Sequence, residues 1–321
     1  NTLSTNALAI VIAGKSSQGW DGTVTATAIG TDSFVGFDEV YGGKGVDTFT
    51  SSVTTWAGGL AISGYGGNDN FNFSNLTSGT LTIYDTTGHG SGADSATVGN
   101  GAQLSITSGN ETVVGNDTWT AGSHTSDSLN YSASTAATTW ALTANAGSTG
   151  FDGTVTGTSV GTDTFTGFEN FTLSGQNETV TVSGARGISL NLGAGNDTFT
   201  GGSGVDYVTL GGGNDTVVFK YLSNTVRGGH SEDSVRGFAF TNDTLKFDTA
   251  MFTGAVDANN LTNYMRMSTT AGQLHCLQID RDGTGSTWGW TNFAWFDSPD
   301  GTLPITADLT TMFNASRIVI A

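Results

Sequence analysis

A nine-residue period constrains this chain more than any other feature of its sequence. From Leu192 the sequence reads in consecutive nines as LGAGNDTFT, GGSGVDYVT, LGGGNDTVV, FKYLSNTVR and GGHSEDSVR. The eighth place of each unit is apolar, and the sixth is held by Asp197, Asp206, Asp215, Asn224 and Asp233. Each unit joins a Gly-rich turn to a short strand, and nine residues cannot bury an apolar face alone. The units are therefore predicted to stack as rungs of a β-solenoid.

Stacking places acidic side chains on top of one another. Successive turns would lie on opposite sides of the coil, so residues two units apart would share a side. We expect Asp197 above Asp215, Asp215 above Asp233, and Asp206 above Asn224. Rungs are about 4.7–4.9 Å apart, and carboxylates at that separation repel unless a cation lies between them. Carboxylates and turn carbonyls favour Ca²⁺, so several calcium sites are predicted, with ordinary Asx turns as the alternative.

A longer repeat organises the rest of the chain. The segment from Asp21 to Phe37 recurs from Asp152 to Phe168, at an offset of 131 residues. The sequence predicts a degenerate solenoid copy over 1–127, a β-roll copy over 128–236, and a distinct β-rich cap over 237–321. The fold class is therefore predicted to be all-β: a parallel β-roll or β-solenoid that ends in a distinct β-rich cap. Three further candidate ligands, Asp47, Asp69 and Asp94, are spaced by 22 and 25 residues, in wider rungs whose metal occupancy stays open. Glu178 in the second copy is a fourth, with a longer side chain than the motif favours.

Charge narrows the choice of partners. The chain has 10 Lys and Arg against 28 Asp and Glu, a net charge of −18. Such acidity disfavours binding to nucleic acid and to anionic membranes, and it leaves carboxylates that need a counter-charge. The single cysteine, Cys276, cannot form an intrachain disulfide. No apolar run approaches the length of a membrane span, so no membrane insertion is expected.

The enzyme motifs that appear are incomplete. Residues 157–161 fit G-x-S-x-G, but no strand, elbow and helix pattern surrounds them. Gly14-Lys15-Ser16 lacks the first glycine of a P-loop, and no zinc or haem spacing occurs. Asp280 and Asp282 begin a run without the final glutamate of an EF-hand, which favours a hairpin turn. We therefore expect that this chain is not an enzyme.

The unit GGSGVDYVT matches the nonapeptide G-G-x-G-x-D-x-U-x, so this region resembles the RTX (repeats-in-toxin) family. The tail, with EDSVRGFAFTNDTLKFD, a strand-rich region and the apolar end RIVIA, resembles a type I secretion C-terminal domain. The resemblance implies a calcium-binding parallel β-roll, and a protein secreted to the exterior of a Gram-negative bacterium.

Two classes of function follow from these expectations. The first is a structural surface protein that assembles with copies of itself, such as a surface-layer, adhesin or matrix subunit. The alternative is a C-terminal module of a larger secreted enzyme or of a ligand-binding adhesin. The aromatic run Trp288, Trp290, Phe293, Trp295 and Phe296 favours a cap on the solenoid core, with a cell-surface glycan as a further candidate partner.

Overall fold

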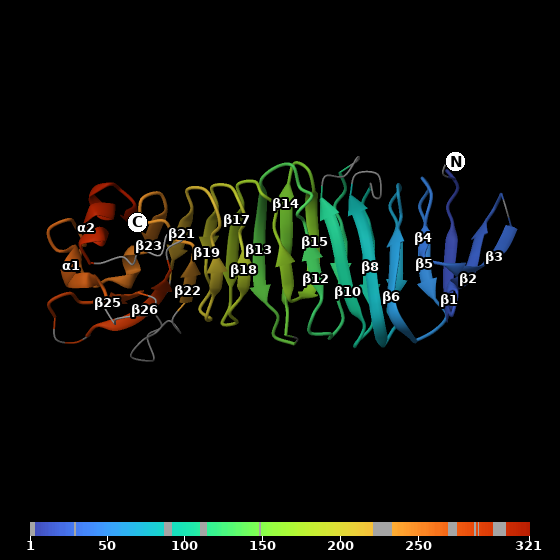
Figure 1. Ribbon diagram of the computed structural model, residues 1–321, viewed down its shortest axis with the longest axis horizontal. Coiled ribbons are helices and arrows are strands. Elements are labelled where there is room, and N and C mark those ends of the chain that lie inside the picture. The colour runs from blue at the N-terminus through green and yellow to red at the C-terminus, as the bar shows by residue number, and fades with distance from the viewer. Residues whose placement is uncertain are drawn as a thin grey trace. The chain divides into compact units, whose positions relative to one another are not determined.

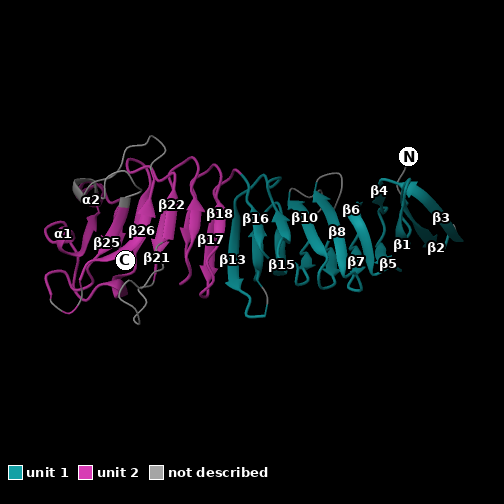
Figure 2. Cartoon of the chain, turned by 60° about the horizontal axis from the view of Figure 1, so that its bottom comes forward, with its two compact units in different colours: residues 1–174 teal, residues 175–321 magenta. Residues whose placement is uncertain are grey.

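The structure is a computed structural model that describes residues 4–28, 30–86, 92–109, 114–147, 149–220, 233–268, 275–285, 287, 289–297 and 306–321. It contains two compact units, residues 1–174 and 175–321 (Figure 2). Strands dominate both units, and the predicted all-β parallel β-roll is confirmed. The expected parts 1–127, 128–236 and 237–321 rest on sequence repeats and stay a prediction.

Unit 1 is a coil whose turns contribute one strand to each of two parallel sheets (Figure 1). The coil strands of the first sheet are β5 (Thr48–Ser51), β7 (Asn70–Phe73), β9 (Ser95–Val98) and β11 (Thr118–Thr120). The second sheet contains β4 (Glu39–Tyr41), β6 (Thr55–Ser63), β8 (Ser78–Thr86), β10 (Gln103–Gly109), β12 (Ser128–Asn130) and β16 (Asn170–Thr172).

The core of unit 1 consists of rows of identical or similar side chains, because alternate residues of each strand point inward. Leu60, Leu81 and Leu104 occupy matching positions of β6, β8 and β10, and all three are buried. In the first sheet, the rings of Phe49 and Phe71 stack with centroids 4.8 Å apart. Parallel register therefore turns a repeated apolar place in the sequence into a continuous core.

The 131-residue repeat forms something other than a solenoid rung. Each copy is a three-stranded antiparallel meander, with strands β1 (Ala9–Ser16), β2 (Gly19–Ala26) and β3 (Gly30–Phe37), and β13 (Thr138–Ala144), β14 (Phe151–Gly157) and β15 (Gly161–Phe168). Both copies have an irregular register at the same place, and the carboxylates of Asp21 and Asp152 accept the N–H groups of Gly36 and Gly167. The expectation that these segments are degenerate rungs was wrong. A strand alternates inward and outward residues whether it pairs in an antiparallel hairpin or in a parallel coil, so the two look alike in sequence.

Unit 2 repeats the two-sheet coil with shorter rungs. One sheet contains β17 (Thr179–Ser183), β19 (Thr198–Thr200), β21 (Thr216–Phe219), β23 (Thr244–Phe247) and β27 (Ile318–Ile320). The other contains β18 (Ser189–Asn191), β20 (Tyr207–Thr209), β22 (Asp233–Arg236), β26 (Thr291–Phe296), β25 (His275–Ile279) and β24 (Met265–Met267). Within the nonapeptide region these strands pair in parallel, with three residues of β19 opposite three of β21.

The end of unit 2 combines an antiparallel hairpin with three short helical segments. Strands β24, β25 and β26 pair antiparallel, and β26 also continues the coil by pairing in parallel with β22. The helical segments are η1 (Thr249–Met251), α1 (Leu261–Tyr264) and α2 (Thr306–Asn314), where the sequence predicted a β-rich cap. No helix in the described ranges is long and apolar enough to cross a membrane.

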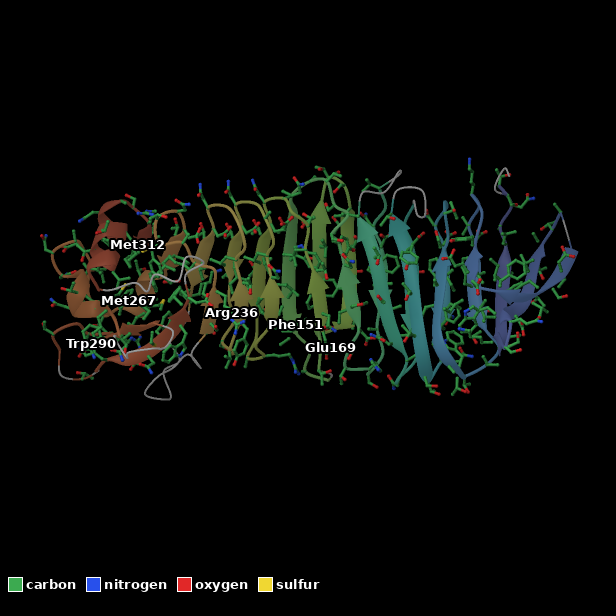
Figure 3. The ribbon with its side chains drawn as sticks, in the orientation of Figure 1. Phe151, Glu169, Arg236, Met267, Trp290 and Met312 are labelled. Atoms are coloured by element: carbon green, nitrogen blue, oxygen red, sulfur yellow. The ribbon has the colours of Figure 1, made fainter. Side chains whose placement is uncertain are left out.

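The aromatic run of this region contributes to the core. Phe293 and Phe296 are buried, and Phe293 packs against Phe219 with ring centroids 4.8 Å apart. Trp290 lies instead beneath the guanidinium group of Arg266, at 4.2 Å from the ring centroid, and Figure 3 labels it at the end of unit 2. Trp288 lies outside the described residues. The capping role expected for the run is therefore filled by its phenylalanines.

Candidate metal centre

The predicted acidic residues of unit 1 are brought together in a single file. Each one directly precedes a strand of the first sheet, and its Oδ1 atom accepts the backbone N–H of the residue at the same place in the preceding coil. The donor-to-acceptor distances are 2.7 Å from Asp47 to Asp69, 2.8 Å from Asp69 to Asp94, 2.8 Å from Asp94 to Asp117 and 2.9 Å from Asp117 to Asp163. We call this file the unit 1 ladder. The unequal spacings, 22 residues from Asp47 to Asp69 and 25 from Asp69 to Asp94, do not interrupt it.

Two of its members were missed by sequence reasoning. Asp117 follows the same Gly-Asn pair that precedes Asp69, so its local signal was present. Asp163 lies 46 residues beyond Asp117, because two antiparallel strands of the second meander intervene. No regular period marks such a gap, and only the tertiary pairing of β15 with β11 aligns the two carboxylates.

Unit 2 contains a ladder on each side of its coil. On one side the N–H of Glu178 donates to Asp197 at 2.7 Å, Asp197 donates to Asp215 at 2.8 Å, and Asp215 donates to Asp243 at 2.8 Å. On the other side the N–H of Ile188 donates to Asp206 at 3.0 Å, and Asp206 donates to Asp233 at 2.8 Å. The expected stacking of Asp197 on Asp215 is present, at a separation of 18 residues.

The stacking of Asp215 on Asp233 that the sequence predicts was wrong. Asp215 pairs with Asp243 instead of Asp233, and among the described residues Asp206 pairs with Asp233. These pairs are 28 and 27 residues apart, because the coil after β21 is longer than the nonapeptide period allows. Asn224 lies outside the described residues. In the described residues, the 18-residue stacking is therefore observed up to Asp215.

A further acidic pair was not predicted. Asp127 precedes β12 in the second sheet of unit 1, and its Oδ1 atom accepts the N–H of Leu104 at 2.6 Å. The N–H of Asp127 in turn donates to the carboxylate of Glu169 at 3.0 Å, and Glu169 is labelled in Figure 3. Unit 1 therefore also contains acidic stacking on the turns that lead into its second sheet.

Glycine packing explains why the turns have their sequence. Gly213 has a φ of +140°, and a Cβ atom there would overlap the carbonyl oxygen of Gly195 in the neighbouring coil. Asparagine provides a second file beside the acidic one, since Asn177 accepts the N–H of Asn196 at 2.7 Å and Asn196 accepts that of Asn214 at 2.8 Å. The Gly-Asn-Asp turn thus supplies close contact, an amide acceptor and a carboxylate acceptor at three successive places.

Hydrogen bonding satisfies only part of several ladder carboxylates, although both oxygen atoms of Asp47, Asp163 and Asp243 accept hydrogen bonds. The second oxygen atoms of Asp69, Asp117, Asp197 and Asp206 are buried without a hydrogen-bond partner. The side chains of the predicted ligands that the structure describes are all buried, at 4% exposure or less. A buried anionic oxygen without a donor is costly unless a proton or a cation compensates it. Orphaned oxygens of this kind fit a hard, oxygen-seeking cation.

Burial shifts the titration of these groups. Burial, with a smaller contribution from neighbouring carboxylates, raises the pKa of Asp69, Asp197 and Asp233 to about 7. Burial likewise raises the pKa of Asp206 and of Asp215 to about 6. The hydrogen bonds from backbone N–H groups oppose these shifts, and at Asp243 the guanidinium of Arg317 also lowers the pKa. The pKa of Asp47 is also raised by burial.

A row of residues at matching places of β8, β10 and the end of β12 contacts the ladder side of unit 1. The Ser108 hydroxyl donates to Asp85 at 3.3 Å, and the Tyr131 hydroxyl donates to Asp163 at 2.6 Å. Both acceptors are fully buried. Asp85 was not a predicted site residue, because it lies at the end of a strand and outside any Gly-rich turn. Tyr131 thus satisfies the second oxygen of Asp163, whereas the second oxygens of Asp69 and Asp117 have no donor.

The other motifs singled out in the sequence have structural partners of their own. The hydroxyl of Ser159 lies in the turn between β14 and β15, 2.7 Å from the hydroxyl of Ser134. Asp280 and Asp282 lie at the turn between β25 and β26, as the hairpin interpretation expected. Within the described part of the chain, no three His, Cys, Asp or Glu side chains form a ready metal cluster.

Comparison with known proteins characterises one segment. Residues 189–217 match the RTX calcium-binding nonapeptide repeat, in four copies. This segment spans β18, β19, β20 and the start of β21, and it includes Asp197, Asp206 and Asp215. A search of curated proteins finds no match to the chain. The segment is thus similar to repeats that bind calcium, and it coincides with the most regular ladders.

Proposed function

We propose that this chain is a calcium-dependent structural protein of the cell exterior, whose buried acidic ladders are completed by Ca²⁺. The observation that carries the proposal is the set of buried, unpartnered carboxylate oxygens in the segment that matches the calcium-binding repeat. Asp197, Asp206 and Asp215 would be the principal ligands, with Asp233 and Asp243 at the ends of their ladders. Backbone carbonyl oxygens of the Gly-rich turns would provide further ligands of the kind that Ca²⁺ prefers.

In unit 1 the ladder of Asp47, Asp69, Asp94, Asp117 and Asp163 is a second candidate region, and Glu178 would begin the one in unit 2. Bound Ca²⁺ would supply positive charge to carboxylates that otherwise repel one another. The ladder carboxylates could then stay ionised while they accept the backbone N–H groups of the preceding coil. Ion binding and folding would be coupled, because the ladder forms only when distant coils have stacked.

The test is a pair of thermal melts followed by circular dichroism, one in Ca²⁺ and one in EGTA. We expect a higher melting temperature and a larger β signal in Ca²⁺, and no comparable effect of Mg²⁺, which prefers fewer and more rigidly placed ligands. Asp197→Asn should reduce the calcium-induced shift, whereas Asp38→Asn, at an exposed position, should leave it intact. Identical melts in Ca²⁺ and EGTA would contradict calcium-dependent folding.

We further propose that the chain has no catalytic role and that it acts by assembling with other copies. Support comes from its composition and repeat architecture, and from a tail that resembles a type I secretion domain, which suits export from a Gram-negative bacterium. Electron microscopy in Ca²⁺ and after chelation would test assembly: ordered sheets or filaments that dissolve in EGTA are expected. Monodisperse particles in both conditions would instead favour the module of a larger secreted protein.

A cell-surface glycan is a second candidate partner, at Trp290. Trp290 is half-buried directly before β26, and the guanidinium group of Arg266 lies over its ring. Stacking on an aromatic ring is a common mode of sugar binding, so a glycan array with a Trp290→Ala control would test this role. An identical binding profile for the two proteins would exclude it.

A further inference from the structure

The two antiparallel meanders have nearly the same third strand. Strand β3 reads GTDSFVGF and β15 reads GTDTFTGF, so they differ only at Ser33 and Val35, which correspond to Thr164 and Thr166. Their second strands and their internal hydrogen bonds also correspond, from Asp21 to Gly36 and from Asp152 to Gly167. The contacts of one third strand therefore indicate which kind of strand and turn the other could bind.

Strand β15 is covered by a coil of the β-roll. It pairs in parallel with β11, with Thr118 opposite Thr164 and Trp119 opposite Phe165. The N–H of Thr164 donates to the carbonyl oxygen of Asp117 at 2.9 Å. The Asp163 carboxylate accepts the N–H of Asp117, also at 2.9 Å. This joint buries the inward face of the strand.

Contacts between β15 and the neighbouring coil continue at the turn that precedes β11. The N–H of Thr162 donates to the side-chain oxygen of Asn116 at 2.9 Å, and Gly161 packs against the carbonyl oxygen of Gly115. The second meander therefore contacts both the Gly-Asn-Asp turn and the strand of the neighbouring coil. The segment that β15 contacts runs from Gly115 to Thr120.

Strand β3 keeps this receiving surface but is exposed. Among the described residues of unit 1, β2 is the strand that pairs with it, and its other edge carries no strand. Val35 is 63% exposed and Phe37 is 53% exposed, whereas the equivalent Phe168 is fully buried. Asp32, the equivalent of the buried Asp163, is also exposed. Figure 1 shows β3 in blue at the end of the sheet that contains β1 and β2.

We propose that the free edge of β3 is a docking site for the open end of another β-roll, whose last coil carries a Gly-Asn-Asp turn followed by a Thr-aromatic-Thr strand. The interface is continuous in kind with the β11–β15 joint inside this chain. Ser33 and Val35 pair their outward backbone groups in parallel with the incoming strand. The Asp32 carboxylate accepts the N–H of the incoming aspartate, and Phe34 and Phe37 are covered by its apolar residues.

The chemistry of the edge favours a coil over other strands. An antiparallel strand, such as β3 of a second copy, would not bring an acidic turn to Asp32. Interior coils such as β7 and β9 are already paired on both sides, so the partner must be a coil that terminates its own sheet. This inference goes beyond the proposed function and does not require that the partner be another copy of this chain.

The test compares the chain with an extended variant in which a copy of residues 92–137 is fused directly before Ala7. Ala7 is the equivalent of residue 138 in the 131-residue repeat, so the copied coil would precede the first meander as the original precedes the second. Amide hydrogen exchange is measured by NMR at Ser33 and Val35, with Thr164 and Thr166 as internal references. In the unmodified chain, Ser33 and Val35 should exchange fast and the references slowly. In the extended chain, exchange at Ser33 and Val35 should slow by at least about tenfold, because their amides become part of a buried ladder.

Two controls keep the result interpretable. Val35→Pro in the extended chain removes an outward N–H without touching the ladder to β2, and it should restore fast exchange at Ser33. A second variant that carries only a copy of residues 114–137 replaces the first if the longer copy does not fold. Sedimentation of the unmodified chain at several concentrations reports whether β3 pairs with itself.

The outcomes separate this inference from the proposed function. Fast exchange at Ser33 in every extended variant, in a protein whose references stay protected and whose melting temperature still rises with Ca²⁺, would overturn the docking site alone. Slow exchange in the unmodified chain that depends on protein concentration would also overturn it, in favour of pairing between two copies. Protection only in the extended chains supports it.

Discussion

At the scale of single residues, the Gly-Asn-Asp turn combines three separate requirements. The glycine permits contact with the carbonyl of the next coil, the asparagine accepts one backbone N–H, and the aspartate accepts another from the opposite direction along the coil. In the turns of Asp69, Asp117 and Asp197, the aspartate also retains one buried oxygen without a donor. A turn that is fully satisfied by its backbone would have no such oxygen, so the carboxylate is where a cation would act.

Adjacent glycines at the turn before Asp215 should respond very differently to alanine. Gly213 has a φ of +140° and meets a carbonyl of the neighbouring coil, whereas a Cβ on Gly212 would meet nothing within 4 Å. We expect Gly213→Ala to lower the free energy of unfolding by about 1–3 kcal/mol or more. Gly212→Ala should change it by less than about 0.5 kcal/mol. Urea denaturation in Ca²⁺ measures both, and equal losses would contradict the packing described here.

The raised pKa values of Asp69 and Asp197, about 7 in the folded chain, predict an unusual dependence on pH without metal. A folded pKa above the unfolded value of about 4 means that the folded state binds more protons between these values. The stabilisation is therefore present at low pH and is lost as the pH rises through about 7. In EGTA, these groups should make the melting temperature higher near pH 5 than near pH 8.

Calcium should reverse that trend, because protons and cations compete for the same carboxylates. In Ca²⁺, the stabilisation gained over EGTA should grow from about pH 5 to about pH 8. Melting curves at both pH values, with and without EGTA, provide the four measurements needed. A metal-free chain that is more stable at the higher pH would be inconsistent with buried carboxylates in the ladders.

At the scale of elements, the two meanders interrupt the parallel coil, and their third strands have different neighbours. Strand β15 lies between β14 and β11, whereas β3 has β2 beside it and an exposed second edge in the described part of unit 1. The two strands have almost the same sequence, so their different burial is a property of their surroundings. Local sequence cannot distinguish an edge strand from a covered one when the receiving residues are the same.

Proline at equivalent places in these two strands should expose this difference. Thr166→Pro removes an N–H that faces β11, and we expect a loss of about 1–3 kcal/mol of unfolding free energy. Val35→Pro removes the equivalent N–H at the exposed edge and should cost less than about 0.5 kcal/mol. Chemical denaturation of the two variants checks the pair. A large loss from Val35→Pro would show that β3 is already covered.

At the scale of the whole molecule, the balance of charge opposes compact folding when no cation is bound. The net charge is −18, and ladder carboxylates face one another in both units. Without metal, dissolved salt should stabilise the chain by screening this repulsion, because the Debye length falls from about 30 Å at 0.01 M to about 3 Å at 1 M. We expect the melting temperature in EGTA to rise with NaCl, and to rise much less with NaCl when Ca²⁺ is present.

Calorimetry in the same buffers checks this prediction, with sucrose at matched osmolality as the control for effects unrelated to charge. A melting temperature in EGTA that does not change with NaCl would mean that the acidic side chains are already neutralised by protons. The pH series above would then have to show no loss of stability on the way to pH 8. The two experiments therefore test one electrostatic account by independent routes.

The sequence alone was sufficient for the all-β class, for the short rungs, and for the acidic and glycine places of residues 192–217. The reason is that these contacts repeat at 18 residues, so a period in the chain corresponds directly to a contact in space. Tertiary structure decided the rest: the partners of Asp215 and Asp206, the entry of Asp117 and Asp163 into a ladder, and the antiparallel course of the 131-residue repeat. Those contacts join strands across insertions of unequal length, and their register depends on which buried edges meet.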